Sequence, residues 1–201
     1  MLENKLGIKS DTELSKMEEK ITKLKALEIY DTFKFNGGTF KDLSLIHEYL
    51  FSDIYEFAGK LRTVNISKGN FRFAASIYLE DILAKIDTMP DNNFDEIINK
   101  YVEMNIAHPF REGNGRSTRI WLDMLLKNRL SLVIDWSNVN KEDYLMAMER
   151  SPIKSLEIKV LLKEALTSDI NNRLVYMKGI DMSYKYEGYS TYKLEDLVKK
   201  I

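Results

Sequence analysis

Apolar residues recur along most of the chain at the three- and four-residue spacing of amphipathic helices. Helix-capping residues precede several of these segments: Ser10 the first, Thr39 the second and Asn140 a later one. Pro90 and Pro152 follow the ends of two others. The expected apolar faces are Leu14, Met17, Ile21 and Leu24; Leu43, Ile46, His47 and Leu50; Leu79, Ile82, Leu83, Ile86 and Met89; Phe94, Ile97, Ile98, Tyr101 and Met104; Tyr144, Leu145 and Met148; and Leu156, Val160 and Leu161. The pattern predicts an all-α fold, a helical bundle.

One segment departs from the helical spacing. Residues 61–67 alternate between apolar and polar types, Lys68-Gly69-Asn70 is typical of a turn, and residues 71–73 alternate again. This predicts one short β-hairpin, at about residues 61–74. Because an isolated hairpin is barely stable in water, we expect it to lie on the helical body with one strand edge open.

The most unusual stretch lies between two predicted helices, at residues 108–119, with the sequence His-Pro-Phe-Arg-Glu-Gly-Asn-Gly-Arg-Ser-Thr-Arg. Proline disfavours helical geometry in the residue before it, so the preceding helix should end at His108. A strongly apolar helix should follow, with Ile120, Trp121, Met124 and Leu125 in the core. We interpret it as the buried central helix, and the stretch as a loop between two helices.

The loop has the chemistry of a phosphate site. Gly113, Asn114 and Gly115 can adopt backbone angles that point successive amides inward, and the N-terminus of the next helix adds a favourable dipole for an anion. Arg116 and Arg119 lie three residues apart, so both should project from one side of that helix. Two guanidinium groups beside an amide cradle suit a polyphosphate.

Two further residues complete a candidate catalytic site. Glu112 offers a hard oxygen ligand for Mg²⁺ beside phosphates, and His108 could take a proton from an attacking hydroxyl. We expect Phe110 to pack in the core. Each element alone is more often structural: a Gly-Asn-Gly turn, a hydrogen-bonded histidine, a solvated arginine face. Their order within one loop favours a site for a nucleoside triphosphate and its metal.

Composition narrows the possible classes. The 201 residues are 44% hydrophobic and 30% charged, which fits one globular domain over residues 1–201. The 30 basic and 31 acidic side chains argue against a sequence-independent nucleic-acid binder. There is no cysteine, so disulfides and zinc–thiolate sites are excluded. No apolar run has membrane-spanning length and no signal-peptide pattern is present, so we expect a cytoplasmic protein without membrane contact.

The string His-Pro-Phe-x-Glu-Gly-Asn-Gly-Arg-x-x-Arg resembles the signature of the Fic family (filamentation induced by cyclic AMP), with no departure at the signature positions 108–119. Residues 54–62 also resemble the segment that leads into the family's flap, and the predicted hairpin falls where that flap is expected. In element order the resemblance covers roughly residues 40–190.

The resemblance implies a mainly helical Fic fold, with a core at about residues 40–165, a flap at 61–74 and a C-terminal inhibitory helix at 181–189. It also implies transfer of AMP from ATP to a Tyr, Ser or Thr hydroxyl of a target protein. The implied roles are His108 as the base; Glu112 as the Mg²⁺ ligand; Gly113, Asn114 and Gly115 as the anion hole; and Arg116 and Arg119 as ligands of the β- and γ-phosphates.

The hairpin would hold an extended target segment along its open edge by main-chain hydrogen bonds. Lys68, at its turn, is equally well read as a phosphate contact or as a solvated residue. Asn105 is a candidate for the nucleotide pocket, although an exposed or capping asparagine is the commoner case. We expect His47, on an apolar face, to be a hydrogen-bonded core residue.

The tail contains a second informative pattern. Ser183 and Glu187 would share one face of a helix that Gly188 ends, which by itself predicts a terminal helix packed on the body. Ser-x-x-x-Glu-Gly also resembles the family's inhibitory motif. That resemblance implies that Glu187 pairs with Arg119 and displaces the γ-phosphate, with Ser183 helping to hold the helix. Two neighbouring tyrosines are candidates for self-modification, namely Tyr184 and Tyr186.

Two alternatives stay open. The same scaffold could transfer another group, such as UMP, phosphocholine or phosphate, or the chain could be a non-catalytic helical module that binds peptides along the hairpin. The sequence does not identify the target. The resemblance suggests bacterial type II topoisomerase subunits, and self-association into a homo-oligomer would brace the tail.

Overall fold

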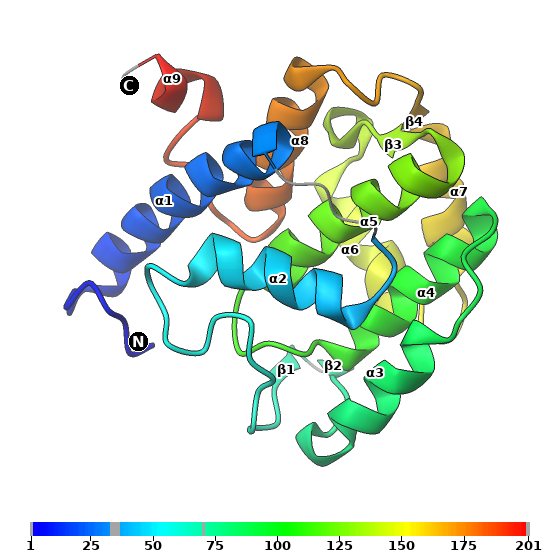
Figure 1. Cartoon of the computed structure of the whole chain (residues 1–201), viewed down its shortest axis with the longest axis horizontal. Helices are drawn as coiled ribbons and strands as arrows, with labels where there is room; N and C mark the ends of the chain where they lie inside the picture. Colours follow the sequence, from blue (N-terminus) through cyan, green and yellow to red (C-terminus); the bar gives the residue numbers. More distant parts are fainter. Residues whose placement is uncertain (1, 33–36, 70, 200–201) are drawn as a thin grey trace.

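The structure is a computed structural model that describes residues 2–32, 37–69 and 71–199. Among these residues the α-helices are α1 (Asp11–Thr32), α2 (Phe40–Phe51), α3 (Leu79–Asp87), α4 (Phe94–Ala107), α5 (Asn114–Leu130), α6 (Lys141–Arg150), α7 (Leu156–Glu164), α8 (Arg173–Tyr186) and α9 (Leu194–Val198). Short 3₁₀ turns lie at Ser76–Tyr78 and Trp136–Asn138, and the strands are β1 (Ser67–Lys68), β2 (Phe71–Arg72), β3 (Val133–Ile134) and β4 (Leu166–Thr167). The fold is helical, as the sequence predicts (Figure 1).

Helix α5 runs through the middle of the bundle, packed against α2, α4 and α8 (Figure 1). Most of its apolar residues are almost completely buried, including Trp121, Leu122 and Leu125, whereas Met124, also expected in the core, is partly buried. The Trp121 ring nitrogen donates a hydrogen bond to the Thr39 carbonyl at 3.0 Å, which ties the start of α2 to this core. The predicted central helix is therefore confirmed, and its N-terminus carries the candidate loop into the body of the protein.

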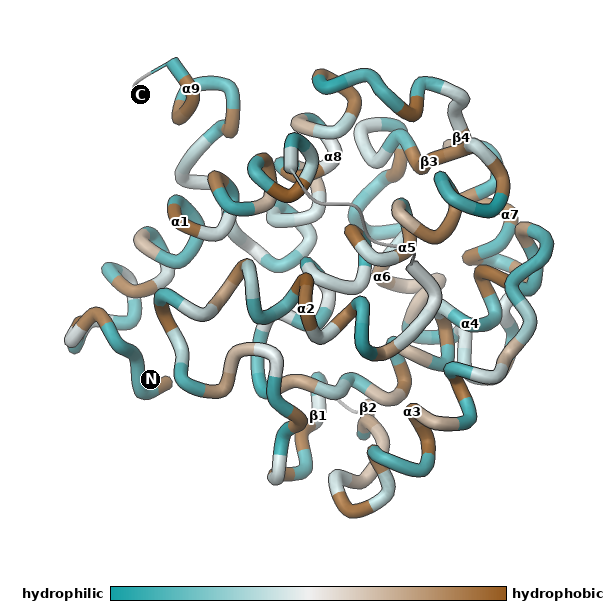
Figure 2. Tube along the Cα trace, viewed as in Figure 1, coloured by the Kyte–Doolittle hydropathy of each residue, from teal (hydrophilic) through white to brown (hydrophobic). Residues whose placement is uncertain are grey.

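Capping residues mark the helix starts as predicted. The Thr39 hydroxyl accepts the Asp42 amide at the start of α2, and the Asn140 side chain accepts the Glu142 and Asp143 amides at the start of α6. Along the surface helices, hydrophilic and hydrophobic positions follow one another at helical spacing (Figure 2). This amphipathic pattern is why each of these helices lies flat against the core.

The hairpin is present but much shorter than predicted. Only Ser67–Lys68 and Phe71–Arg72 pair, antiparallel, and Asn70 of the predicted turn lies outside the described residues. The strand expected at residues 61–67 is wrong except at Ser67. The Arg62 amide, for example, donates to the Pro109 carbonyl instead of to a partner strand. A second antiparallel pair, β3 with β4, was not predicted.

The tail helix is longer than its motif indicates. The predicted bounds of 181–189 are wrong: α8 begins at Arg173, and Glu187 is its C-terminal cap. Gly188 ends it with a φ of +91°, a conformation that favours glycine. Helices α8 and α9 pack against α1, so the first and last helices of the chain lie side by side (Figure 1).

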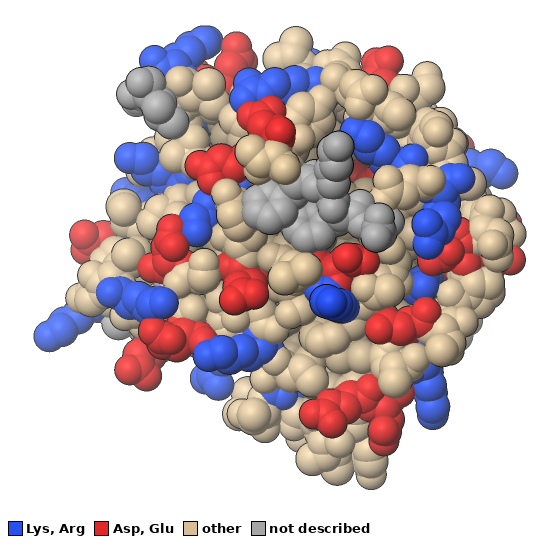
Figure 3. All heavy atoms as spheres, viewed as in Figure 1, with Lys and Arg blue, Asp and Glu red and all other residues tan. Residues whose placement is uncertain are grey.

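Lys, Arg, Asp and Glu are interspersed on the face shown in Figure 3, in keeping with the net charge of −1. Within the described ranges, none of the helices is both long enough and apolar enough to cross a bilayer.

Candidate active site

A cavity of 740 Å³ opens where the 108–113 loop, the N-terminus of α5, the hairpin, α6 and the tail meet. It brings together most of the predicted site residues: Lys68, Asn105, His108, Glu112, Gly113, Asn114, Gly115, Arg119 and Glu187. Arg116, Ser183, Gly188, Tyr184 and Tyr186 do not line it. One concave surface thus contains side chains from elements that are far apart in the sequence, from Lys68 of the hairpin to Glu187 of the tail.

His108 is the C-cap of α4, with a left-handed φ of 47° that turns the chain into the loop. Its ring is stacked on Phe73 of the hairpin, with the ring centroids 3.6 Å apart. Nδ1 lies 3.2 Å from the Asn105 carbonyl, which leaves Nε2 as the proton acceptor if Nδ1 carries the hydrogen. Burial lowers the pKa of His108 to about 4, so the ring is neutral at pH 7 and able to act as a base.

Arg62, whose contacts the sequence does not indicate, fixes the backbone around His108. Its Nε donates to the His108 carbonyl at 2.7 Å, while its Nη atoms donate to the carbonyls of Val64 and Ala74, at 2.7 and 2.5 Å. Those two carbonyls belong to the segments that enter and leave the hairpin. A single buried guanidinium therefore sets the position of the hairpin relative to the candidate base.

Polar contacts within the loop, which the sequence does not indicate, hold its shape. The Asn114 side chain accepts the Phe110 amide at 2.8 Å and donates to the Phe110 carbonyl at 2.7 Å. Phe110 is buried, as predicted, and stacks on His47 at 3.8 Å. The side chain of Asn114 thus closes the loop, so its backbone amide is the group that could serve the predicted anion site.

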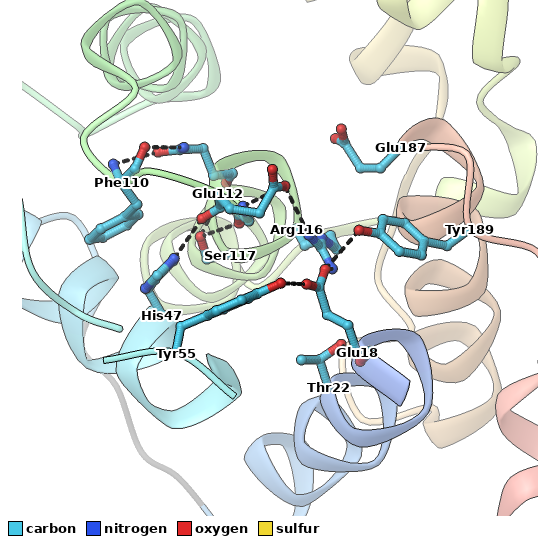
Figure 4. Close-up of polar contacts among 12 residues, drawn as sticks. Glu18, Thr22, His47, Tyr55, Phe110, Glu112, Arg116, Ser117, Glu187 and Tyr189 are labelled. Atoms are coloured by element: carbon cyan, nitrogen blue, oxygen red, sulfur yellow. Dashed lines mark hydrogen bonds and ion pairs between the residues drawn. The ribbon is translucent and has the colours of Figure 1, made fainter. Parts of the chain in front are cut away.

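His47 is the hydrogen-bonded core residue that the sequence predicts. Its Nδ1 accepts the Gly59 amide at 2.9 Å, so Nε2 carries the hydrogen and donates to the Glu112 carbonyl at 2.8 Å (Figure 4). Burial lowers its pKa to about 3, which keeps the ring neutral. His47 fixes the loop one residue before the glycines.

The Glu187 carboxylate lies directly over Gly115 of the loop. A Cβ atom on Gly115 would come within 2.2 Å of Glu187 Oε1, and the same oxygen is 3.0 Å from Arg119 Nη2. Ser183 holds the same guanidinium: its Oγ accepts from Nε at 2.7 Å and its carbonyl accepts from Nη2 at 2.8 Å. An anionic group of the protein therefore occupies the mouth of the predicted anion cradle.

Electrostatics keep Glu187 ionised there. Burial by itself would raise the pKa of Glu187, but the opposing charges of Arg119 and Lys68 lower it to about 2. Lys68, in the first strand of the hairpin, has its Nζ 3.5 Å from Glu187 Oε2, and its side chain is 64% exposed. Lys68 thus lines the cavity and forms a solvated ion pair with the tail.

Arg116 takes a different place from Arg119. Its side chain is fully buried, with Nη1 2.6 Å from Glu18 of α1 and Nη2 3.1 Å from Glu112 (Figure 4). In this structure the two arginines do not form a pair above the cavity, because α1 supplies a carboxylate that draws Arg116 inward.

Glu112 fits a Mg²⁺ ligand. Its side chain is 43% exposed at the cavity, and Gly113 and Arg116 both bond to Oε1, so these contacts leave Oε2 for a cation. Among the described residues there is no group of three His, Cys, Asp or Glu side chains that would hold a metal by itself. A metal at Glu112 would need phosphate oxygens and water as its other ligands.

The two tail tyrosines are buried, at 0% exposure for Tyr184 and 2% for Tyr186. The Tyr186 hydroxyl donates to the Val139 carbonyl at 2.9 Å. Neither hydroxyl can be modified while α8 keeps this position.

Residues 38–126 match the model of the Fic/DOC family. The chain is 30% identical over 191 residues to the protein adenylyltransferase VbhT of Bartonella schoenbuchensis, covering 89% of this chain and 40% of that protein. It is 25% identical over 179 residues to the probable protein adenylyltransferase Fic of Salmonella typhimurium, covering 83% of this chain and 88% of that protein. Residues 38–126 therefore form a domain of the Fic/DOC family.

Solved Fic domains share the fold. The N-terminal Fic domain of Bep8 from Bartonella sp. 1-1C has a TM-score of 0.75 at 19% identity, covering 85% of this chain and 92% of that one. BepC of Bartonella tribocorum, solved with bound AMPPNP, has a TM-score of 0.70 at 20% identity, covering 83% and 92%. The 108–119 loop and the hairpin side of the cavity fall within the matched family range, whereas α1, the α6 side of the cavity and the tail with Glu187 lie outside it.

Proposed function

We propose that this chain is a protein adenylyltransferase that moves AMP from ATP to a hydroxyl group of a target protein and is inhibited by its own Glu187. The proposal rests on one observation above all. His108, the amide cradle and Arg119 surround one cavity, and the Glu187 carboxylate lies over Gly115 and beside Arg119, the position that we propose for a phosphate. The relatives named as protein adenylyltransferases support the choice of reaction.

In the proposed reaction the target hydroxyl loses its proton to His108 and its oxygen attacks the α-phosphorus. The bond to the β-phosphate oxygen breaks, pyrophosphate leaves, and AMP becomes esterified to the target. The first amides of α5 and the Arg119 guanidinium stabilise the negative charge that develops on the phosphates. Glu112 would hold Mg²⁺, which neutralises phosphate charge when bound.

The hairpin is the proposed docking rail for the target. Its strands pair only with each other among the described residues, so an outer edge is available for main-chain hydrogen bonds. Phe73, stacked on His108, and Lys68, at the rim, place this edge beside the base. Asn105 would contribute to the nucleotide wall of the cavity. Type II topoisomerase subunits are the first targets to test.

The experiment that tests the reaction is labelling of cell lysate by the Glu187→Gly variant with ATP, CTP, GTP or UTP labelled at the α-phosphate. We expect labelled proteins with ATP and little labelling with the other three. His108→Ala in the same background should abolish labelling while ATP still binds in calorimetry. Labelling that survives without His108 would remove it from the role of base.

Transfer of a different group is the second enzymatic possibility, and labelling by UTP would favour it. A peptide-binding module would instead bind ATP or peptide without any transfer in the Glu187→Gly variant. The co-location of a neutral histidine, an amide cradle and Arg119 in one cavity favours the enzyme.

Self-modification of Tyr184 or Tyr186 would need the end of α8 to leave its packed position, because both rings are buried. Modification of either would therefore keep the tail away from Arg119 once it had occurred. Peptide mass spectrometry of an active sample tests this, and a tail without AMP adducts would contradict it.

A further inference from the structure

A buried carboxylate of the first helix joins the loop and the tail. Glu18 of α1 has 2% of its surface exposed. Its Oε1 accepts from Arg116 Nη1 at 2.6 Å and from the Tyr189 hydroxyl at 2.7 Å, while its Oε2 accepts from the Tyr55 hydroxyl (Figure 4). Glu18 therefore touches α5, the tail and the segment after α2 at once.

Glu18 supplies most of the neutralisation that Arg116 needs. A fully buried guanidinium is costly unless a carboxylate and hydrogen bonds compensate it. Glu18 is the buried partner, since Glu112 is 43% exposed and shared with the cavity. The rings of Phe51 and Tyr189 lie 4.9 and 4.6 Å from the guanidinium carbon and confine it further. The direction of the Arg116 side chain is thus set from α1.

The opposite end of the same guanidinium contacts Glu112, which lines the cavity. Arg116 Nη2 holds Glu112 Oε1 at 3.1 Å. A chain of contacts from Glu18 through Arg116 therefore orients the carboxylate that we propose as the metal ligand.

The tail is fastened to the same point. Tyr189 follows Gly188, two residues after Glu187, and its amide bonds to the Tyr184 carbonyl at 3.0 Å. The neighbouring Glu19 accepts the amides of Thr191 and Tyr192 at 3.0 and 3.1 Å. Helix α1 thus binds the backbone that follows α8 as well as the tyrosine hydroxyl.

We propose that Glu18 is a positioning residue for the site: through Arg116 it orients Glu112, and through Tyr189 it holds the end of α8 where Glu187 meets Arg119. The metal role of Glu112 and the inhibitory role of Glu187 rest on the proposed function. The contacts of Glu18 make α1, which lies outside the matched family range, part of the site.

Two tyrosine variants test the link to the tail. Tyr189→Phe and Tyr55→Phe each remove one hydroxyl from the same carboxylate and keep the ring, so both should fold. Hydrogen exchange of the amides at residues 183–188 should become about threefold faster or more in Tyr189→Phe, the effect of one lost hydrogen bond. It should stay at the wild-type rate in Tyr55→Phe. Equal exchange in both variants and wild type would overturn the link.

Glu18→Gln tests the orientation of Glu112. Without the Glu18 charge, Arg116 should pair more tightly with Glu112 and compete with Mg²⁺. In the Glu187→Gly background, the gain in ATP affinity on adding Mg²⁺ should fall about threefold or more, the contribution of one ion pair. Glu13→Gln, an exposed glutamate of the same helix, is the matched control and should keep the full gain. A full gain in Glu18→Gln as well would contradict the proposal.

Both measurements are independent of AMP transfer. If the Glu187→Gly variant transfers no nucleotide but Glu18→Gln and Tyr189→Phe behave as expected, the proposed reaction fails and the positioning role of Glu18 stands. If transfer occurs and neither variant differs from its control, the reaction stands and the role of Glu18 is lost.

Discussion

His108 illustrates how single residues make this site. Its identity could be predicted from the sequence, because the motif and the following proline place it at a helix end. Its environment could not, since Phe73 and Arg62 are brought to it by the hairpin, from more than 30 residues away. The contacts of Arg62 and Glu18 could likewise not be predicted, because neither residue lies in a local sequence pattern that indicates its partners.

The buried position of His108 predicts an unusual pH profile. The pKa of His108 is lowered to about 4 by burial, so the neutral form that accepts a proton persists well below pH 6.5. The Glu187→Gly variant should keep its transfer rate from pH 7.5 down to about 5.5 and lose it only as pH approaches the lowered pKa. Half of the rate lost near pH 6.5, with unchanged ATP affinity, would show an unshifted histidine.

Arg62 should be needed for the rate and not for nucleotide binding. A lysine in its place has one point of attachment and cannot hold the carbonyls of His108, Val64 and Ala74 together. Arg62→Lys in the Glu187→Gly background should lower the turnover rate by about tenfold to a hundredfold, with ATP affinity unchanged. Arg72→Lys, at an exposed arginine of the same hairpin, is the control. Equal rates in the two variants would contradict the role of Arg62.

At the scale of elements, helix starts were predicted well and strands poorly. Thr39 and Asn140 cap helices as expected, because capping is a local interaction between a side chain and the next turn. The strand expected at residues 61–67 is wrong because its backbone groups bond elsewhere: the Arg62 amide to the Pro109 carbonyl, and the Val64 carbonyl to the Arg62 side chain. The pairing of β3 with β4 joins segments more than 30 residues apart and left no local signal.

The hairpin and the tail helix meet at a solvated ion pair, so this contact should matter little. Lys68 is 64% exposed and lies 3.5 Å from Glu187, a geometry worth about 0.2–1 kcal/mol. Lys68→Ala should therefore raise the basal transfer rate of the native chain by no more than about fivefold. An increase as large as that from Glu187→Gly would mean that Lys68, and not Arg119, is the main partner of the tail.

In the whole molecule, the site depends on contacts between the two ends of the chain. Glu18 and Tyr189 are 171 residues apart in sequence and 2.7 Å apart in space. Apolar periodicity predicted a helix at the position of α1, and the spacing of Ser183 and Glu187 before Gly188 predicted a terminal helix, but neither pattern indicates that the two pack together. Contacts between the two ends of the chain are seen only once the helices are packed together around α5.

Stability should likewise depend on the packing around α5. Leu122 is fully buried there, whereas Leu174 of α8 is 59% exposed. Leu122→Ala should lower the free energy of unfolding by about 2–5 kcal/mol, and Leu174→Ala should change it by less than about 0.5 kcal/mol. Urea unfolding of both variants measures the difference. Similar losses in the two would show that α5 is not the centre of the core.

The central claim is that Glu187 keeps an assembled transferase site idle by occupying the phosphate position at Arg119. The most direct measurement compares the initial rates of AMP incorporation from α-labelled ATP for the wild-type chain and Glu187→Gly, at equal protein concentration. Removing one internal competitor should raise the rate by about 5- to 150-fold, the usual range of such coupling. The double variant His108→Ala, Glu187→Gly should give the background. Equal rates for wild type and Glu187→Gly, both above that background, would contradict the account.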